Sequence, residues 1–141
     1  MNEEMTNLFS NDAYAKKLNI KLVEWDEGYA KTEITITEEM LNFHKAAHGG
    51  LVFSLADYAF AIASNSHGQV AVGISTNMSY VEAAELGERL TCTATEVNNN
   101  GRLAIYNMEV KGDNGNLKAT MEGMVYRKRE TFAKTAVKVK E

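Results

Sequence analysis

One long apolar run in the middle of the chain constrains the fold more than any other feature. Residues 51–63 read LVFSLADYAFAIA, and only Ser54 and Asp57 among these thirteen positions are polar. Alanine and leucine favour helix over strand, and a helix that is apolar almost all round is a buried one. The run is also shorter than the roughly eighteen residues expected of a membrane span. It therefore predicts a buried central helix over Leu51–Ala63, ended by Asn65–Gly68.

Segments that alternate between apolar and polar residues surround this helix. Two of them, Ile20–Trp25 and Tyr29–Ile36, flank an Asp-Glu-Gly turn before it. Four longer ones follow it, at residues 70–83, 88–97, 103–112 and 117–128. Period-two alternation is typical of half-buried strands, and the Asn-Gly steps between the later segments are hairpin signals. The pattern predicts an α+β fold with about six antiparallel strands curled around one helix.

Less regular segments complete the chain. Residues 10–18 (SNDAYAKKL) predict a short packing helix, and Thr37–Glu39 indicates a helical turn. Residues 42–50 (NFHKAAHGG) have no period and are interpreted as a loop. The last fifteen residues, 127–141, hold six basic and two acidic side chains and are interpreted as a solvated basic tail. We expect one domain over residues 1–141.

Composition limits the class of function. The 141 residues are too few for separate cofactor and substrate lobes, and the net charge of −4 gives no general attraction to nucleic acid. The single Cys92 permits no internal disulfide, and no cluster has metal-ligand spacing, since His44 and His67 lack acidic or thiol partners. The acidic start of the chain is unlike a secretory signal. We expect a cytoplasmic protein with no membrane segment and no metal site.

Asp57 is the first candidate for chemistry. It lies among Ala56, Tyr58, Ala59 and Phe60 in the apolar run, and charged residues are seldom buried without a partner or a task. One interpretation is an internal hydrogen-bond or ion-pair anchor. The other is a catalytic carboxylate whose ionisation the apolar setting tunes.

His48-Gly49-Gly50 stands where that helix is expected to begin. Backbone N–H groups of a first helical turn are unpaired and lie at the positive end of the helix dipole. A carbonyl oxygen on the Gly50 N–H would be polarised as in an oxyanion hole. The simpler interpretation is a tight turn into the helix, but the presence of Asp57 favours the catalytic one.

Helix geometry separates these two groups. Seven residues are two turns, about 10.5 Å along the axis, so Gly50 and Asp57 of one chain share a face but cannot both touch one carbonyl centre. Two such helices packed antiparallel about a two-fold axis would bring Asp57 of one chain to Gly50 of the other. The chemistry therefore predicts a homodimer with two shared sites.

Residues Asn42 to Asp57 follow the pattern N-x5-HGG-x6-D, and a strand through Asn77–Tyr80 and a turn at Leu86–Glu88 come after it. Together these features resemble the hotdog-fold acyl-CoA thioesterases of the PaaI (phenylacetate-degradation) type. The resemblance covers residues 41–127. It implies a long helix wrapped by an antiparallel sheet, dimers that often pair into tetramers, and hydrolysis of acyl-CoA thioesters without metal or organic cofactor.

The resemblance also implies roles for the motif residues. Asp57 would be the nucleophile or the general base, Gly50 would polarise the thioester carbonyl, and His48 and Asn42 would place the loop and the attacking water or the thioester. The candidate substrate contacts are Gly49, Ser54, Tyr58, Ser75, Thr76 and Arg127. Tyr58 and Phe60 would line an acyl pocket if they do not belong to the core. Aryl or short to medium acyl groups are the expected substrates.

Two positions depart from the family pattern. Gly73 stands where members often carry serine or threonine, so Ser75 or Thr76 would replace that hydroxyl only if its side chain points inward. Glu82-Ala83 replaces a common Arg-Pro pair and removes a cation for the phosphates of CoA, which Arg127 would then supply. These departures leave open the alternative of an acyl-binding hotdog protein without turnover. A hotdog hydratase or dehydratase is the other alternative, but those families use a different His-containing motif that is often proline-rich, and this chain has no proline.

Overall fold

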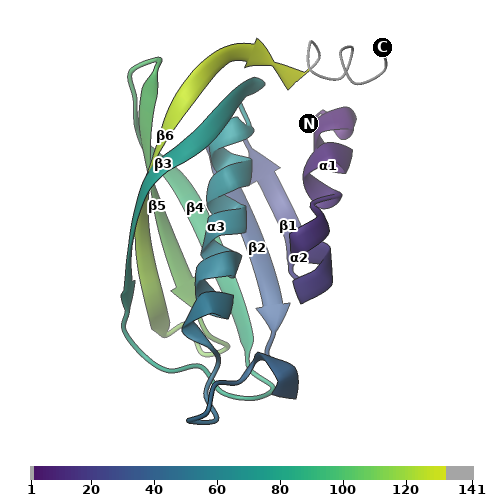
Figure 1. Ribbon diagram of the computed structural model, residues 1–141, viewed down its shortest axis with the longest axis vertical. Coiled ribbons are helices and arrows are strands. Elements are labelled where there is room, and N and C mark those ends of the chain that lie inside the picture. The colour runs from purple at the N-terminus through teal and green to yellow at the C-terminus, as the bar shows by residue number, and fades with distance from the viewer. Residues whose placement is uncertain (1, 133–141) are drawn as a thin grey trace.

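The computed structural model describes residues 2–132 (Figure 1). The elements in chain order are α1 (Glu3–Ser10), α2 (Ala13–Leu18), β1 (Lys21–Asp26), β2 (Tyr29–Thr35), the 3₁₀ turn η1 (Glu38–Met40), α3 (Gly49–Asn65), β3 (Gln69–Tyr80), β4 (Arg89–Asn99), β5 (Leu103–Lys111) and β6 (Leu117–Thr131).

The six strands form one antiparallel sheet in the order β1-β2-β4-β5-β6-β3. The sheet curves around α3, which runs along its concave face, while α1 and α2 lie beside α3 near the β1 edge (Figure 1). The predicted α+β architecture of six strands around one central helix is therefore confirmed. The helix is longer than predicted, since it begins at Gly49 and ends at Asn65.

Alternate residues of the strands face α3 and form the core. On β2, Ala30, Thr32 and Ile34 are almost fully buried, as their spacing predicts. Thr32 is polar, and its hydroxyl donates to the Leu55 carbonyl of α3 at 3.1 Å. The buried hydroxyl is thus satisfied and ties the helix to the sheet. The thiol of Cys92 is also buried in this layer, and burial raises its pKa.

Two glycines allow α3 to approach the sheet closely at Phe60. A Cβ built at Gly123 of β6 would lie 2.6 Å from the Phe60 ring, and one at Gly73 of β3 would lie 3.3 Å from it. The ring packs over these two positions and lies 6.0 Å from Tyr106 between centroids. Phe60 therefore belongs to the core between helix and sheet. A side chain at Gly73 would crowd this ring.

The N-terminal segment differs from the prediction. The helix predicted over residues 10–18 is present but begins later, at Ala13, and a second helix, α1, precedes it with a break at Asn11 and Asp12. Asp12 is the N-cap of α2, and its carboxylate accepts from the Ala15 N–H at 2.9 Å. The additional helix α1 buries Met5 and Phe9. Its residues are too few to show a clear period in the sequence.

The end of the chain also differs. Strand β6 runs to Thr131, so residues 127–131 belong to the sheet and not to a tail; Lys128 and Arg129 are exposed, as predicted, whereas Arg127 is buried. Arg127 is only 3% exposed and donates to Asn99 Oδ1 at 2.7 Å and to the Tyr106 hydroxyl at 3.3 Å. The remaining tail residues, 133–141, lie outside the described part of the chain.

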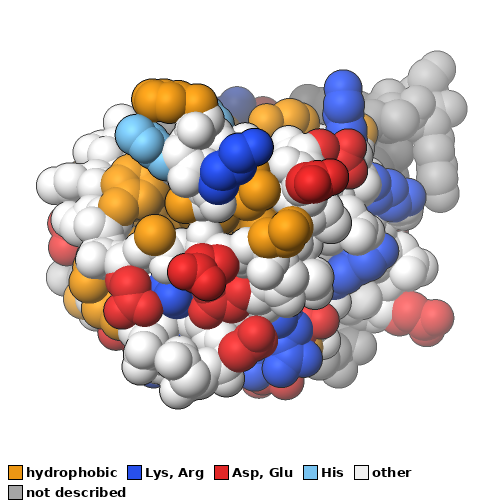
Figure 2. All heavy atoms as spheres, turned by 90° about the horizontal axis from the view of Figure 1, so that it is seen from below, with side chains coloured by type: hydrophobic (Ala, Val, Ile, Leu, Met, Phe, Trp, Pro, Cys, Tyr) orange, Lys and Arg blue, Asp and Glu red, His pale blue; other side chains and the backbone are white. Residues whose placement is uncertain are grey.

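Strand β3 forms an edge of the sheet and is mostly exposed. Its outer side has no neighbouring strand within the described chain, and Ile74 and Tyr80 are 54% and 57% exposed. A long uncovered edge strand of this kind is a template for pairing with another strand. The end of the molecule where α3 begins, at the bottom of Figure 1, exposes apolar side chains beside histidine and lysine (Figure 2). None of the described helices is long and apolar enough to cross a bilayer.

Candidate active site

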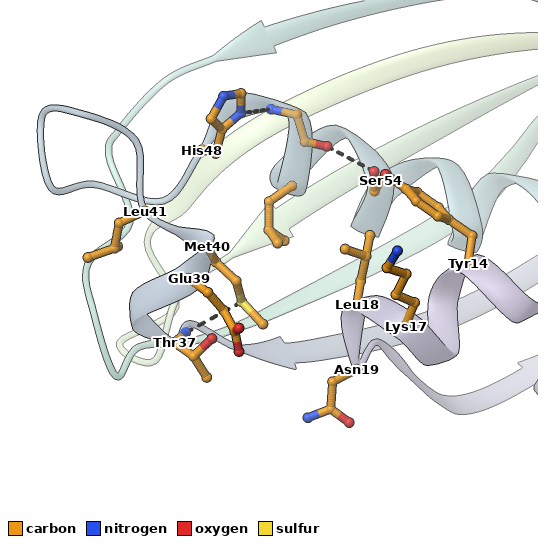
Figure 3. A pocket seen from close by; sticks show the side chains of 12 residues that line it. Tyr14, Lys17, Leu18, Asn19, Thr37, Glu39, Met40, Leu41, His48 and Ser54 are labelled. Carbon is orange, nitrogen blue, oxygen red and sulfur yellow. Dashed lines mark hydrogen bonds between the residues drawn. The ribbon is translucent and has the colours of Figure 1, made fainter.

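His48 organises the first turn of α3. It is the N-cap, and its Nδ1 accepts from the Gly50 N–H at 2.9 Å (Figure 3). An Nδ1 that accepts carries no proton, so a neutral ring in this arrangement has its proton on Nε2. The N–H predicted to polarise a carbonyl is thus present at the helix start but is held by the imidazole. A carbonyl oxygen reaches it only by replacing His48 as the acceptor.

Asn42 shapes the loop that leads to His48. Its side-chain oxygen accepts from the His44 N–H at 2.9 Å and the Ala46 N–H at 3.2 Å, and its backbone N–H donates to the Ala46 carbonyl. Lys45 closes this turn with φ of 70°. The geometry makes Asn42 a residue that holds the loop. Within this chain, Asn42 therefore acts as a turn residue.

A buried lysine anchors the neighbouring loop. Lys118 Nζ lies 2.8 Å from Glu82, 3.0 Å from the Ala83 carbonyl and 3.4 Å from Glu88. The ammonium is the main reason that the pKa of Glu82 is lowered. Residue 84 of this loop accepts from the Ala47 N–H at 2.8 Å, so the lysine also steadies the loop that carries His48. Glu82, the departure from the family pattern, therefore serves as the partner of Lys118.

Asp57 lies on the uncovered face of α3. Gly50, Asp57 and Ala61 are the exposed positions along this helix, and Ser54 between them is half-buried. The stripe confirms that Gly50 and Asp57 share a face, about 10.5 Å apart along the axis. Although Asp57 reaches solvent, partial loss of hydration raises the pKa of its carboxyl group, and the charge of Asp12 adds to the rise. A carboxylate with a raised pKa is suited to accept a proton.

Two hollows lie along this stripe. One, of about 540 Å³, lies between α2, η1 and the start of α3 and includes His48, Gly50 and Ser54 in its lining (Figure 3). The other, of about 230 Å³, contains Asp57 and Tyr58. Ser54 lines both, and its hydroxyl donates to the Gly50 carbonyl at 2.9 Å. The loop that carries His48 and the carboxylate of Asp57 therefore lie along one surface of α3.

The structure places the other candidate contacts at different distances from this surface. Tyr58 lines the smaller hollow, and its hydroxyl donates to the Phe9 carbonyl at 2.6 Å. Gly49 packs beside Tyr80, whose hydroxyl donates to the Gly49 carbonyl at 3.1 Å. Arg127 pairs with Ala71 at the far end of α3 from Gly50, and its guanidinium is used in internal hydrogen bonds.

The register of β3 decides between Ser75 and Thr76. Thr76 pairs with Gly123, whose face of β6 looks toward Phe60, whereas Ser75 pairs with Met124 after a bulge. Residues directly opposite each other in an antiparallel pair point to the same side of the sheet. Thr76 therefore shares the helix-facing side of the sheet, and Ser75 faces away.

Sequence reasoning missed the part that α2 plays. Asp12 and Tyr14 line the hollow that contains Asp57, and Tyr14 also lines the larger one. The sequence predicted a helix here but assigned it only to packing. The available signal was the Asp12 cap, which fixes a second carboxylate at the helix start. No sequence period links that position to Asp57, forty-five residues later.

Comparison with known proteins was made against this geometry. The family model described as Thioesterase superfamily matches residues 44–119, which include the His48 cap, α3, three strands and the start of β6. A putative esterase of Archaeoglobus fulgidus is 44% identical over 92% of this chain and 84% of its own length. This chain belongs to the thioesterase superfamily.

Individual relatives support the same assignment. The acyl-coenzyme A thioesterase PaaI of Escherichia coli is 37% identical over 85% of this chain and 86% of its own. Its solved structure superposes with a TM-score of 0.86 at 36% identity, covering 89% of this chain and 91% of that one. A mutant of the PaaI protein from Thermus thermophilus gives a TM-score of 0.80 at 37% identity, covering 83% and 100%. The hotdog fold implied by the resemblance is confirmed.

Thioester hydrolysis is accordingly the reaction that this thioesterase-superfamily site has to perform. The candidate groups for this reaction are a carboxylate with a raised pKa, a helix N-terminus and the hollow beside that N-terminus. Among residues 2–132, no group of three or more His, Cys, Asp or Glu side chains is arranged to hold a metal ion.

Proposed function

We propose that this protein hydrolyses acyl-CoA thioesters to the free acid and CoA, acting as a homodimer in the cytoplasm. The observation that carries the proposal is that Asp57 and the His48–Gly50 cap lie on the same uncovered face of α3. The similarity to an enzyme named acyl-coenzyme A thioesterase supports the choice of CoA ester. The buried free thiol of Cys92 is compatible with a reducing compartment.

Asp57 in its ionised form is proposed as the general base. It would take a proton from water as the water oxygen attacks the thioester carbonyl carbon. The carbonyl oxygen would replace His48 Nδ1 on the Gly50 N–H, and the helix N-terminus would stabilise the oxyanion. When the tetrahedral intermediate collapses, the C–S bond breaks and the CoA thiolate receives the proton.

Asp57 as a nucleophile is the alternative for the same residue. Its oxygen would attack the carbonyl carbon and expel CoA, leaving an acyl-aspartate anhydride that water then hydrolyses. A single turnover in ¹⁸O-labelled water reveals the nucleophilic route when water attacks the aspartyl carbonyl of the anhydride. The base mechanism places one label in the released acid, whereas attack of water on the aspartyl carbonyl of an anhydride places the label in Asp57.

The dimer rests on distance and on uncovered surface. Gly50 and Asp57 of one chain are about 10.5 Å apart along α3 and cannot serve one carbonyl centre together. The exposed edge of β3 and the exposed stripe of α3 are the two surfaces that an antiparallel second copy would cover. Each active site would then combine the loop of one chain with the carboxylate of its partner.

The test is hydrolysis by purified wild type, Asp57→Ala and Asp57→Asn, followed by free-thiol release from acyl-CoA. Both substitutions should lower kcat by about a hundredfold or more, because a positioned base typically contributes that much. Circular dichroism and size-exclusion chromatography should be unchanged, since Asp57 lies on the surface of α3. Treatment with a chelator should leave activity intact. A fully active Asp57→Ala protein contradicts the mechanism, and acyl-CoA binding without turnover by the wild type favours an acyl-binding protein.

A further inference from the structure

The loop before α3 has three consecutive exposed side chains at its tip, Phe43, His44 and Lys45. Phe43 is 89% exposed, the highest value among the large apolar side chains of residues 2–132. Its ring lies 4.2 Å from that of His44 between centroids, at an angle of 35°. Lys45 forms no ion pair with any residue that the structure describes. The loop tip, residues 43–45, therefore offers an aromatic surface and a positive charge to a partner outside the chain.

Backbone hydrogen bonds fix the shape of this loop. The Asn42 side-chain oxygen accepts from two N–H groups of the loop, and the Lys45 N–H donates to the Asn42 carbonyl at 3.0 Å. The Ala47 N–H donates to the Ala84 carbonyl at 2.8 Å and ties the loop to its neighbour. A surface whose backbone is already fixed loses less conformational freedom when it binds a ligand. The loop tip is thus preorganised for binding.

The turn itself does not account for a lysine at position 45. Lys45 has φ of 70°, in the left-handed region that glycine adopts freely and other residues adopt at a cost in free energy. Its exposed side chain makes no ion pair within residues 2–132 that would offset this cost. The charge of Lys45 is therefore available to a partner outside the chain.

The loop tip lies at the edge of the candidate active site. Leu41 before the tip and His48 after it both line the hollow of about 540 Å³ beside Gly50 (Figure 3). Residues 43–45 do not line that hollow themselves. When the acyl carbonyl lies on the Gly50 N–H, the pantetheine arm of CoA separates the nucleotide from the reacting carbon. A part of the substrate that is remote from the thioester is therefore the part that the tip would contact.

The nucleotide of CoA has the chemistry that matches this tip. Adenine stacks on aromatic side chains, and phosphate groups attract lysine. The sequence predicts that Arg127 meets these phosphates, but its guanidinium is buried at the far end of α3 and used in internal hydrogen bonds. Lys17 lies in the hollow, where Glu39 supplies the opposite charge. Lys45 is an exposed cation only three residues before His48.

We propose that the loop tip binds the nucleotide of the CoA ester, with the Phe43 ring stacked on adenine and Lys45 beside a phosphate group. The inference rests on the thioesterase function proposed above. It names the part of the chain that distinguishes a CoA ester from the ester of a smaller thiol. A second copy of this chain seated on Phe43 is the competing explanation, and the test separates the two.

The test compares hydrolysis of hexanoyl-CoA with that of hexanoyl-pantetheine, which has the same thioester but no nucleotide. Phe43→Ala should lower kcat/KM for hexanoyl-CoA by about tenfold, mostly through a higher KM, because losing a stacked base has an effect of this size. Lys45→Gly suits the left-handed turn and removes the charge, so it should lower kcat/KM by about threefold at low salt and by less at high salt. Both variants should hydrolyse hexanoyl-pantetheine as well as wild type does.

Matched variants isolate the ring and the charge. Phe43→Tyr keeps an aromatic ring and Lys45→Arg keeps the charge, so both should retain the wild-type preference for the CoA ester. Lys128 is an exposed lysine next to Arg127, at the far end of α3 from the loop, and Lys128→Gln should change neither substrate. Phe43→Ala should keep the wild-type Tm, because the ring is almost fully exposed.

The outcomes separate this proposal from the function on which it rests. An active wild type with equal kcat/KM for the two esters overturns the nucleotide site alone, and so does a Phe43→Ala variant that loses the same factor for both esters or for neither. A weaker dimer in sedimentation equilibrium, with equal losses for the two esters, assigns Phe43 to an interface between copies and also overturns the nucleotide site. A wild type that hydrolyses neither ester overturns the proposed function as well.

Discussion

Gly123→Ala should destabilise this protein although it adds only one methyl group. Gly123 on β6 lies under the Phe60 ring, and a Cβ built there would lie 2.6, 2.7 and 2.9 Å from three ring carbons. Carbon atoms in contact normally lie about 3.5 to 4.0 Å apart. The ring would therefore have to move by about 1 Å. It is only 3% exposed and has little space for that movement.

The expected cost follows from this overlap. Overpacking a well-filled core costs about 1 to 3 kcal/mol. Replacing glycine by alanine also reduces the freedom of the unfolded chain, which returns about 0.4 to 1 kcal/mol. The net loss should be about 1 to 2 kcal/mol, because Gly123 does not have a positive φ that would add strain. For a chain of this length, that loss lowers Tm by about 3 to 8 °C.

Two matched variants isolate the cause. Gly73→Ala meets one atom of the same ring at 3.3 Å and should lower Tm by less than Gly123→Ala. Phe60→Leu should itself destabilise, but the double variant Phe60→Leu with Gly123→Ala should lose less than the sum of the two. Thermal and urea unfolding at one protomer concentration measure these differences, because association shifts apparent stability. Equal losses at Gly73 and Gly123, or strictly additive effects with Phe60, would refute the close-packing argument.

Three further predictions concern the site. Asp57→Ala and Asn42→Ala homodimers should both be nearly inactive. Subunit exchange between them should restore activity toward a quarter of wild type, because half of the dimers are then mixed and each mixed dimer carries one intact site. If mass spectrometry shows exchange but activity does not recover, the site is not shared between chains. Asp12→Asn keeps an N-cap acceptor but removes the negative charge that helps to raise the pKa of Asp57. The acidic limb of the plot of kcat/KM against pH should therefore move to lower pH. If that limb does not move, the charge of Asp12 does not affect the titration of Asp57 during catalysis. Lys118→Met should lower kcat, because it loosens the loop that is hydrogen-bonded to Ala47. The control Lys111→Met breaks only the 4.0 Å surface ion pair with Glu109 and should leave kcat unchanged. Equal effects of the two substitutions would argue against Lys118 as the anchor of this loop.

The sequence by itself was enough for the layout of the fold. The apolar run at residues 51–63 and the alternating segments on either side specify one buried helix and six strands, because helical and strand periods differ and are visible within a few residues. The same local reasoning located the His48–Gly50 cap and placed Gly50 and Asp57 on one face. These are properties of a single helix, so no long-range contact was needed.

The N-terminal helices and the chain end were predicted less well. A short helix such as α1 depends on packing for its stability and shows little of its own pattern. The sequence places Arg127 at the start of a basic tail, but the strand carries it to Asn99 and Tyr106, which enclose its guanidinium. A run of charges in the sequence does not reveal whether strand pairing extends through it.

Only the tertiary structure decided what surrounds the candidate site. It showed that the Gly50 N–H is held by His48, that Thr76 and not Ser75 faces the helix side, and that Glu82 pairs with Lys118. It also brought Asp12 and Tyr14 to the hollow that contains Asp57. Apart from the local cap formed by His48, each of these arrangements depends on strand register or on the packing of separate elements. The sequence specifies the local elements, but the distances between side chains on different elements arise only when the sheet closes around α3.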